Sequence, residues 1–167
     1  MQPLELYIHI PFCVKKCAYC DFLSGPAGEK EKEEYVKMLV DEIRNCPDTV
    51  QNYRVISIFF GGGTPSLLTG EQIGRLMDTV REIFTLDEDA EITMEMNPGT
   101  VTEEKLRKYR QAGVNRLSIG LQSVNDEELR LLGRIHTYEE FREAYHLARA
   151  NGFSNINVDL ISAIPGQ

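Results

Sequence analysis

Apolar and polar residues alternate from Leu4 to Ile10, with leucine and isoleucine at the even positions. A period of two residues puts these apolar side chains on one face of a β-strand. The same alternation, together with runs of β-branched and aromatic residues, predicts four further strands, over 55–60, 91–96, 114–121 and 156–161.

Helical spacing of apolar residues fills the segments between these strands. In the segment 30–45, for example, Tyr35, Met38, Leu39 and Ile43 share one face of a helix. This spacing and the turn residues around it predict helices over 30–45, 71–84, 102–113 and 138–151, with a short helix after Asp126.

Strand and helix alternate in units of about 30 residues, as they do in βαβ proteins. That order favours a parallel α/β sheet. A closed barrel of eight units needs about 250 residues, and this protein has 167. We therefore predict one domain over 1–167, an incomplete parallel (β/α) barrel that stops after about five strands.

Composition narrows the class of protein. The formal net charge of −8 at pH 7 argues against a nucleic acid or an anionic membrane surface as the main partner. No apolar run approaches the roughly 20 residues of a membrane span, and the N-terminus does not resemble a signal peptide. Three clustered cysteines and one distant cysteine are typical of metal ligands in a reducing compartment. We expect a cytoplasmic protein.

The clustered cysteines follow the first predicted strand as Cys13, Cys17 and Cys20, with the spacing C-x3-C-x2-C. Three thiolates can hold three irons of a four-iron cluster and leave the fourth iron open, whereas electron-transfer clusters are closed by four cysteines. A structural zinc ion is the alternative, but zinc takes four ligands, and His9 is the only nearby candidate. Cys46 is interpreted as a lone structural thiol.

Polar or glycine positions follow the other predicted strands as well. The second strand ends at Gly61-Gly62-Gly63-Thr64-Pro65, where absent side chains let the backbone approach a ligand. Glu95 and Gln122 end the next two strands, and Asp159 lies late in the last. Taken singly, each polar residue is explained by a solvated position or a helix cap. In a barrel, however, functional groups come from these strand ends, so the set predicts a common site.

These motifs, in this order, resemble the radical S-adenosylmethionine (SAM) superfamily over the whole chain. The matching segments are Tyr7–Cys20, Gly61–Pro65, Glu95–Pro98, Gly120–Ser123, Gly133–Thr137 and Val158–Ile161. The sequence is most similar to the branch that contains the anaerobic coproporphyrinogen III oxidases and the HemW haem chaperones. The resemblance implies six βα units and a C-terminal domain, so the sixth unit and that domain are expected to lie outside this chain.

The resemblance also implies the cofactors. Cys13, Cys17 and Cys20 would bind a [4Fe-4S] cluster, with SAM on its open iron. The family positions for SAM binding correspond here to Tyr7, Tyr19, Gly62, Gly63, Thr64, Glu95, Gln122, Arg134 and Asp159.

Individual roles within that set follow from the same resemblance. Arg134 would pair with the methionine carboxylate and Glu95 with the methionine amino group. Gln122 and Asp159 would accept hydrogen bonds from the ribose hydroxyls. The glycine turn would contact the methionine part, Tyr7 would touch SAM, and Tyr19 would lie against the adenine.

One residue separates the two activities of the branch. The anaerobic oxidases carry a further cysteine two residues after the third ligand, and this chain has Phe22 there. The resemblance therefore favours a chaperone that binds haem and delivers it to client haemoproteins. The alternative is oxygen-independent coproporphyrinogen III oxidase, which decarboxylates its substrate by way of a 5′-deoxyadenosyl radical. Either reading implies haem or a porphyrin as ligand, and a reductant such as a flavodoxin or ferredoxin.

Overall fold

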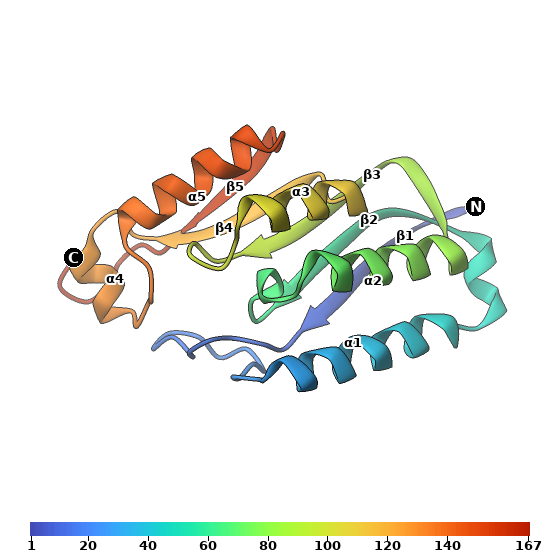
Figure 1. Cartoon of the computed structure of the whole chain (residues 1–167), viewed down its shortest axis with the longest axis horizontal. Coiled ribbons are helices and arrows are strands. Elements are labelled where there is room, and N and C mark those ends of the chain that lie inside the picture. The colour runs from blue at the N-terminus through green and yellow to red at the C-terminus, as the bar shows by residue number, and fades with distance from the viewer.

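A computed structural model describes residues 1–167 and contains one open sheet of five parallel strands (Figure 1). The strands lie side by side in chain order, so each pairs only with its neighbours in the sequence. Their bounds are β1 Gln2–Ile10, β2 Tyr53–Gly62, β3 Thr85–Met96, β4 Arg116–Gln122 and β5 Asn155–Leu160.

Four long helices cover one face of the sheet, and consecutive helices pack against each other (Figure 1). A single helical layer over strands in chain order is the arrangement of a (β/α) barrel, here open between β1 and β5. The predicted incomplete barrel is confirmed. The helices are α1 Glu29–Arg44, α2 Gly70–Ile83, α3 Glu103–Ala112, the short α4 Asp126–Leu131 and α5 Tyr138–Ala150, with 3₁₀ turns η1 Asp48–Asn52 and η2 Pro65–Leu67.

The predicted elements are all present, and the main difference is the start of β3. This strand begins at Thr85, six residues before the alternation that predicted it. Thr85 pairs with Arg54, the register then shifts, and regular pairing resumes where Ser57 meets Glu91. The ion pair between Arg54 and Asp87, at 3.1 Å, lies in the irregular part. The acidic residues Asp87, Glu88 and Asp89 therefore belong to the strand.

The hydrophobic core lies between the sheet and the helices. Alternate strand residues point into it and are buried, among them Ile10, Ile58, Phe60, Met94, Leu117 and Ile119. Full burial of one such side chain stabilises the fold by about 1.5–3 kcal/mol. The intervening residues project from the opposite face, which is polar on β3 to β5. That face carries Thr93, Glu95, Ser118, Asn157 and Asp159.

Side-chain caps fix where the helices begin. The hydroxyl oxygens of Thr69, Thr102 and Thr137 accept backbone N–H groups in the first turns of α2, α3 and α5. A cap of this type contributes about 1 kcal/mol. The caps therefore also define where the segments that lead from β2 to α2, from β3 to α3 and from α4 to α5 must end.

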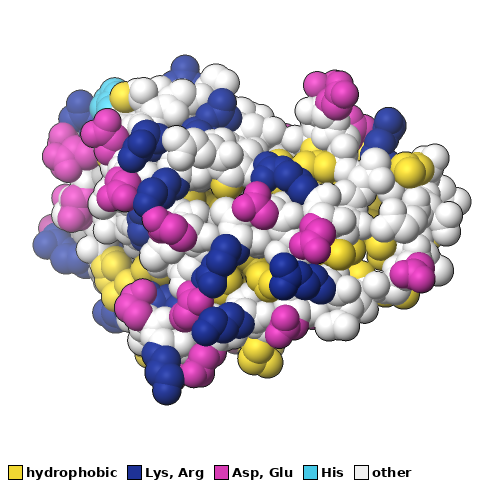
Figure 2. Space-filling model, turned by 45° about the vertical axis from the view of Figure 1, so that its right-hand side comes forward, with side chains coloured by type: hydrophobic (Ala, Val, Ile, Leu, Met, Phe, Trp, Pro, Cys, Tyr) yellow, Lys and Arg dark blue, Asp and Glu magenta, His cyan; other side chains and the backbone are white.

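The outer surface carries charges of both signs. Figure 2 shows Lys and Arg side chains interspersed with Asp and Glu side chains on the face it presents. Many of them form ion pairs, such as the one between Arg75 and Glu33 at 2.6 Å. None of the helices combines the length and the apolar character that crossing a membrane requires.

Candidate functional site

The carboxyl ends of β2 to β5 and the loop that follows β1 border one pocket, which we call the rim pocket. Because parallel strands end at the same edge, segments far apart in the sequence meet there (Figure 1). Of the residues expected to bind the cluster and SAM, all except Tyr7 line it. The lining consists of Cys13, Lys15, Lys16, Cys17, Tyr19, Cys20, Phe22, Gly62, Gly63, Thr64, Glu95, Met96, Asn97, Ser118, Gly120, Gln122, Arg134 and Asp159.

The cysteine loop, residues 11–28, is held in place by backbone hydrogen bonds. The Cys13 N–H donates to the Gly25 carbonyl at 2.9 Å, and the Gly25 N–H donates to the Pro11 carbonyl at 3.0 Å, which closes the loop at its base. Near the middle of the loop, the Ala18 N–H donates to the Leu132 carbonyl after α4, at 3.0 Å. The loop is therefore fastened to two parts of the fold.

The three thiols of this loop are free and partly buried. Cys13 Sγ lies 3.4 Å from Thr64 Oγ1, and Cys17 Sγ lies 3.8 Å from Arg134 Nη1. Cys46 lies outside the pocket, after the end of α1. No three His, Cys, Asp or Glu side chains of the chain converge as ligands of a single metal ion. Three free cysteines in one loop, two of them within reach of hydrogen-bond donors, fit a four-iron cluster, in which each thiolate takes a different iron.

The glycine turn after β2 packs directly against the base of the cysteine loop. The Gly63 N–H donates to the Ile10 carbonyl at 2.8 Å, and the Thr64 N–H donates to the Phe12 carbonyl at 2.6 Å. A Cβ on Gly63 would stand 2.6 Å from the Phe12 carbonyl oxygen. Only glycine permits this approach, and it brings Thr64 to the first cysteine.

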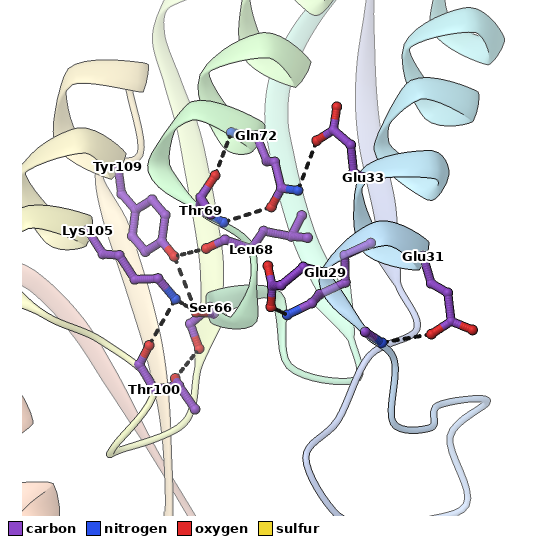
Figure 3. A network of polar contacts seen from close by, with 12 residues as sticks. Glu29, Glu31, Glu33, Ser66, Leu68, Thr69, Gln72, Thr100, Lys105 and Tyr109 are labelled. Atoms are coloured by element: carbon purple, nitrogen blue, oxygen red, sulfur yellow. Dashed lines mark hydrogen bonds and ion pairs between the residues drawn. The ribbon is translucent and has the colours of Figure 1, made fainter.

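The next turn, η2, is held by side chains of α3 and of the loop before α3 (Figure 3). The Lys105 Nζ donates to the Ser66 carbonyl at 2.8 Å, and the Tyr109 hydroxyl donates to the Leu68 carbonyl at 2.6 Å. Ser66 Oγ and Thr100 Oγ1 lie 2.6 Å apart. Buried carbonyls that would otherwise lack donors are thus satisfied by α3, which fixes the turn.

Glu95 projects from the end of β3 toward the glycine turn. Its Oε2 accepts the Gly62 N–H at 3.0 Å. Burial raises the pKa of this carboxyl, the Gly62 hydrogen bond opposes the rise, and the nearby Asp159 adds to it. Two carboxylates in one pocket repel each other, so a cationic ligand group between them is favoured.

Arg134 joins several segments of the rim pocket through hydrogen bonds. Its Nη2 donates to Asn97 Oδ1 and to the Gly120 carbonyl, each at 2.7 Å. Its Nη1 reaches the Tyr19 hydroxyl at 3.3 Å and the Cys17 sulfur. Its buried Nε has no partner within the protein. Two-point pairing of Arg134 with a carboxylate therefore requires release of one of these contacts.

The ends of β4 and β5 complete the pocket. The Ser118 hydroxyl donates to Asp159, with 3.1 Å to Oδ2, and Asn157 Nδ2 donates to Asp159 Oδ1 at 2.7 Å. Gln122 has a φ of 72°, in the region that favours glycine, where the β4–β5 register shifts. Backbone strain of about 1–3 kcal/mol at such a residue is typical of functional sites.

Tyr7 lies on the polar side of the sheet but below the rim pocket, and it is 58% exposed. Its ring stacks on Phe59, and its hydroxyl lies 3.2 Å from His9 Nδ1. His9 Nε2 lies 3.2 Å from the Leu23 carbonyl, which can only accept a hydrogen bond, so Nε2 carries the proton and Nδ1 accepts from Tyr7. Both ring nitrogens of His9 are thus engaged, and Nε2 joins the end of β1 to the cysteine loop.

His136 is 4% exposed and anchors the loop that carries Arg134. Its Nε2 donates to the Leu121 carbonyl at 3.2 Å, while its buried Nδ1 has no partner. Burial lowers the pKa of His136 to about 4, and the charge of Arg134 acts in the same direction. The imidazole is therefore neutral in the folded protein.

We expect His136 to make the protein sensitive to acid. Between about pH 6.5 and about pH 4, His136 is protonated in the unfolded chain but stays neutral in the folded protein. The free energy of unfolding should fall over this window by up to about 3 kcal/mol, whereas it is unaffected above it. Urea unfolding of His136→Gln should show a correspondingly weaker pH dependence.

The matched control for this prediction is His146→Gln, since His146 is exposed on α5. That variant should keep the pH dependence of the unmodified protein. An equal dependence in His136→Gln would show that His136 does not carry the effect.

Comparisons with known proteins agree with this geometry. A family model described as the radical SAM superfamily matches residues 7–167. The chain is 48% identical over 168 residues to heme chaperone HemW of Escherichia coli K12, covering 100% of this chain and 44% of that protein. It is 41% identical over 172 residues to heme chaperone HemW of Haemophilus influenzae Rd, covering 100% and 45%.

A solved structure gives the same fold. Coproporphyrinogen III oxidase (HemN) of Escherichia coli, a radical SAM enzyme, superposes with a TM-score of 0.90 at 38% identity, over 99% of this chain and 38% of that one. The chain thus spans less than half the length of the relatives it matches.

Proposed function

Because the chain belongs to the radical SAM superfamily, we propose that its rim pocket holds the two cofactors that this family implies, a four-iron cluster and SAM. Cys13, Cys17 and Cys20 are the proposed cluster ligands. The proposal is supported by their common loop, by the absence of a fourth cysteine in the pocket, and by the donors beside two of their sulfurs. When bound, the reduced cluster and SAM supply one-electron cleavage of a carbon–sulfur bond.

The remaining side chains of the pocket would bind and orient SAM. Glu95, with Asp159 nearby, is suited to the methionine ammonium, because two carboxylates favour a cation between them. Asp159 and Gln122 are the proposed acceptors for ribose hydroxyls. Arg134 would meet the methionine carboxylate through its unpartnered Nε, or through Nη atoms that exchange partners. Gly62, Gly63 and Thr64 would offer a close backbone surface, and Tyr19 a ring face.

We propose that the whole protein is a haem chaperone, of which residues 1–167 form part of the radical SAM core. The observation that carries this proposal is the 48% identity to a heme chaperone over the entire chain. Phe22 supports it, because an exposed aromatic side chain stands in the rim pocket where the anaerobic oxidases have a cysteine. Haem, client haemoproteins, a flavodoxin-like or ferredoxin-like reductant and a reducing, cytoplasmic environment are the corresponding partners and location.

The second candidate is oxygen-independent coproporphyrinogen III oxidase, which is favoured by the TM-score of 0.90 to that enzyme. One anaerobic preparation of the full-length protein distinguishes the two. A chaperone should bind haem, seen by its absorbance, and pass it to an apo-haemoprotein. It should form no protoporphyrinogen IX from coproporphyrinogen III when SAM and a reductant are present.

The outcomes of that experiment are separable by product mass. Protoporphyrinogen IX formed over several turnovers would overturn the chaperone proposal and establish the second candidate. Release of 5′-deoxyadenosine alone would not, because an open cluster can cleave SAM slowly without a porphyrin. Failure to bind or transfer haem would also overturn it.

A further inference from the structure

The charge of Arg134 is not neutralised by any carboxylate, although two line the same pocket. More than half of the Lys and Arg side chains of the chain form ion pairs, and Arg134 is not among them. Its four Nη contacts are all to neutral groups or to a thiol. A full positive charge is therefore held against the sulfur of Cys17.

The contacts around Arg134 leave it little freedom. Asn97 Oδ1 and the Gly120 carbonyl, both at 2.7 Å, fix Nη2 at the edge of the sheet. Gly120 is what makes room for the guanidinium, because a Cβ there would lie 3.2 Å from Nη2 and 2.9 Å from Gln122 Nε2. Fixed in this way, Nη1 faces the cysteine loop.

The hydrogen bonds of Arg134 also extend, through two further side chains, to the sulfur of Cys13. Asn97 uses its oxygen to accept from Arg134 and its Nδ2 to donate to Thr64 Oγ1 at 3.0 Å. With its oxygen already accepting, the Thr64 hydroxyl is free to donate to Cys13 Sγ at 3.4 Å. One connected set of hydrogen bonds thus runs from Arg134 to two of the three cysteines.

Reduction adds negative charge to an iron–sulfur cluster. A nearby cation and hydrogen bonds to the sulfurs stabilise that added charge and raise the reduction potential. We propose that Arg134 raises the reduction potential of the cluster bound by the cysteine loop, in the absence of SAM. It acts directly beside Cys17, and on Cys13 through the hydrogen bonds of Asn97 and Thr64. This inference rests on the proposed cluster, and it gives Arg134 a role distinct from contact with SAM.

The test is a redox titration of the reconstituted full-length protein without SAM, followed by electron paramagnetic resonance. Dithionite, through dye mediators, donates one electron to each cluster, and no bond in the protein forms or breaks. In Arg134→Met, which removes the charge at similar length, the reduction equilibrium should shift at least tenfold toward the oxidised form. That shift is about 59 mV to more negative potential for a one-electron couple. Arg134→Lys, which keeps the charge, should shift less.

Two further variants keep the test decisive. Asn97→Asp has nearly the same shape but places a carboxylate against Arg134 Nη2, so it should also shift the potential to a more negative value. Arg130→Met is the control, since Arg130 is exposed on α4 and forms an ion pair with Glu127, and it should not shift the potential.

The outcomes separate this inference from the proposed function. Failure of the unmodified protein to bind iron would refute the proposed cluster itself. An unchanged potential in iron-replete Arg134→Met would overturn the inference. If Arg134→Met does not assemble a cluster, an unchanged potential in Asn97→Asp would overturn it instead.

Discussion

Cys13→Ala, Cys17→Ala and Cys20→Ala are each expected to lose most of the iron and sulfide that the anaerobically reconstituted protein binds. The effect should be nearly complete, because a four-iron cluster held by three thiolates has no spare ligand. The backbone bonds that close the cysteine loop do not involve these side chains, so the variants should still fold. Colorimetric iron and sulfide assays measure the loss, and circular dichroism checks the fold.

Cys46→Ala is the matched control for these three variants. Cys46 is also a free, partly buried thiol, but it lies after α1 and outside the rim pocket. It should keep the full iron content. Full retention of iron in Cys17→Ala would refute the ligand assignment. Loss of iron in Cys46→Ala would show that iron loss in this assay reflects general damage to the protein.

Replacing Glu95 should weaken SAM binding by roughly tenfold to a hundredfold. Glu95→Gln keeps the size of the side chain and an oxygen that can accept the Gly62 N–H, but it removes the charge that would face the methionine ammonium. A charge-assisted hydrogen bond is worth about 1.5–3 kcal/mol, which corresponds to that range of affinity. Calorimetry on cluster-loaded protein measures it directly.

The same strand offers a control for Glu95. Glu91 is a half-exposed carboxylate near Arg116, at 3.6 Å, and it lies four residues before the pocket. Glu91→Gln should leave the SAM affinity within about twofold, because a surface ion pair contributes only about 0–1 kcal/mol. Equal affinities for Glu95→Gln and the unmodified protein would contradict the proposed role.

Much of the site was predictable because its residues stand at strand ends. Periodicity in the sequence locates the ends of the strands, and a parallel sheet brings those ends together. Glu95, Gln122 and Asp159 needed no further information to be grouped. The cysteine spacing was similarly local, since all three thiols lie within one loop.

The roles of Asn97 and Ser118 were not predictable in this way. In the sequence, Asn97 looks like the residue that ends a strand before Pro98. Its importance comes from Thr64 and Arg134, which lie 33 and 37 positions away and meet it only in the folded chain. Ser118 likewise gains its partner, Asp159, from the neighbouring strand. A local pattern carries no signal for either contact.

For Tyr7, the sequence pattern predicts the face of the sheet but not the distance from the rim pocket. The two-residue alternation correctly puts it on the polar side of the sheet, opposite the helices. Its depth along the strand depends on the register with β2, where Tyr7 pairs with Phe59 and the rim begins only at Gly62. Alternation in a single strand gives the side on which a residue lies, not its height in the sheet.

Each strand pairs only with the strands next to it in the chain. A sheet of this kind can grow at one edge while the ribosome releases the polypeptide, because every new strand meets a partner that is already made. The cysteine loop emerges early, whereas Arg134 and Asp159 emerge late. The nascent thiols are therefore present before the groups that surround them, and we expect productive insertion of iron and sulfide only after β5 has docked.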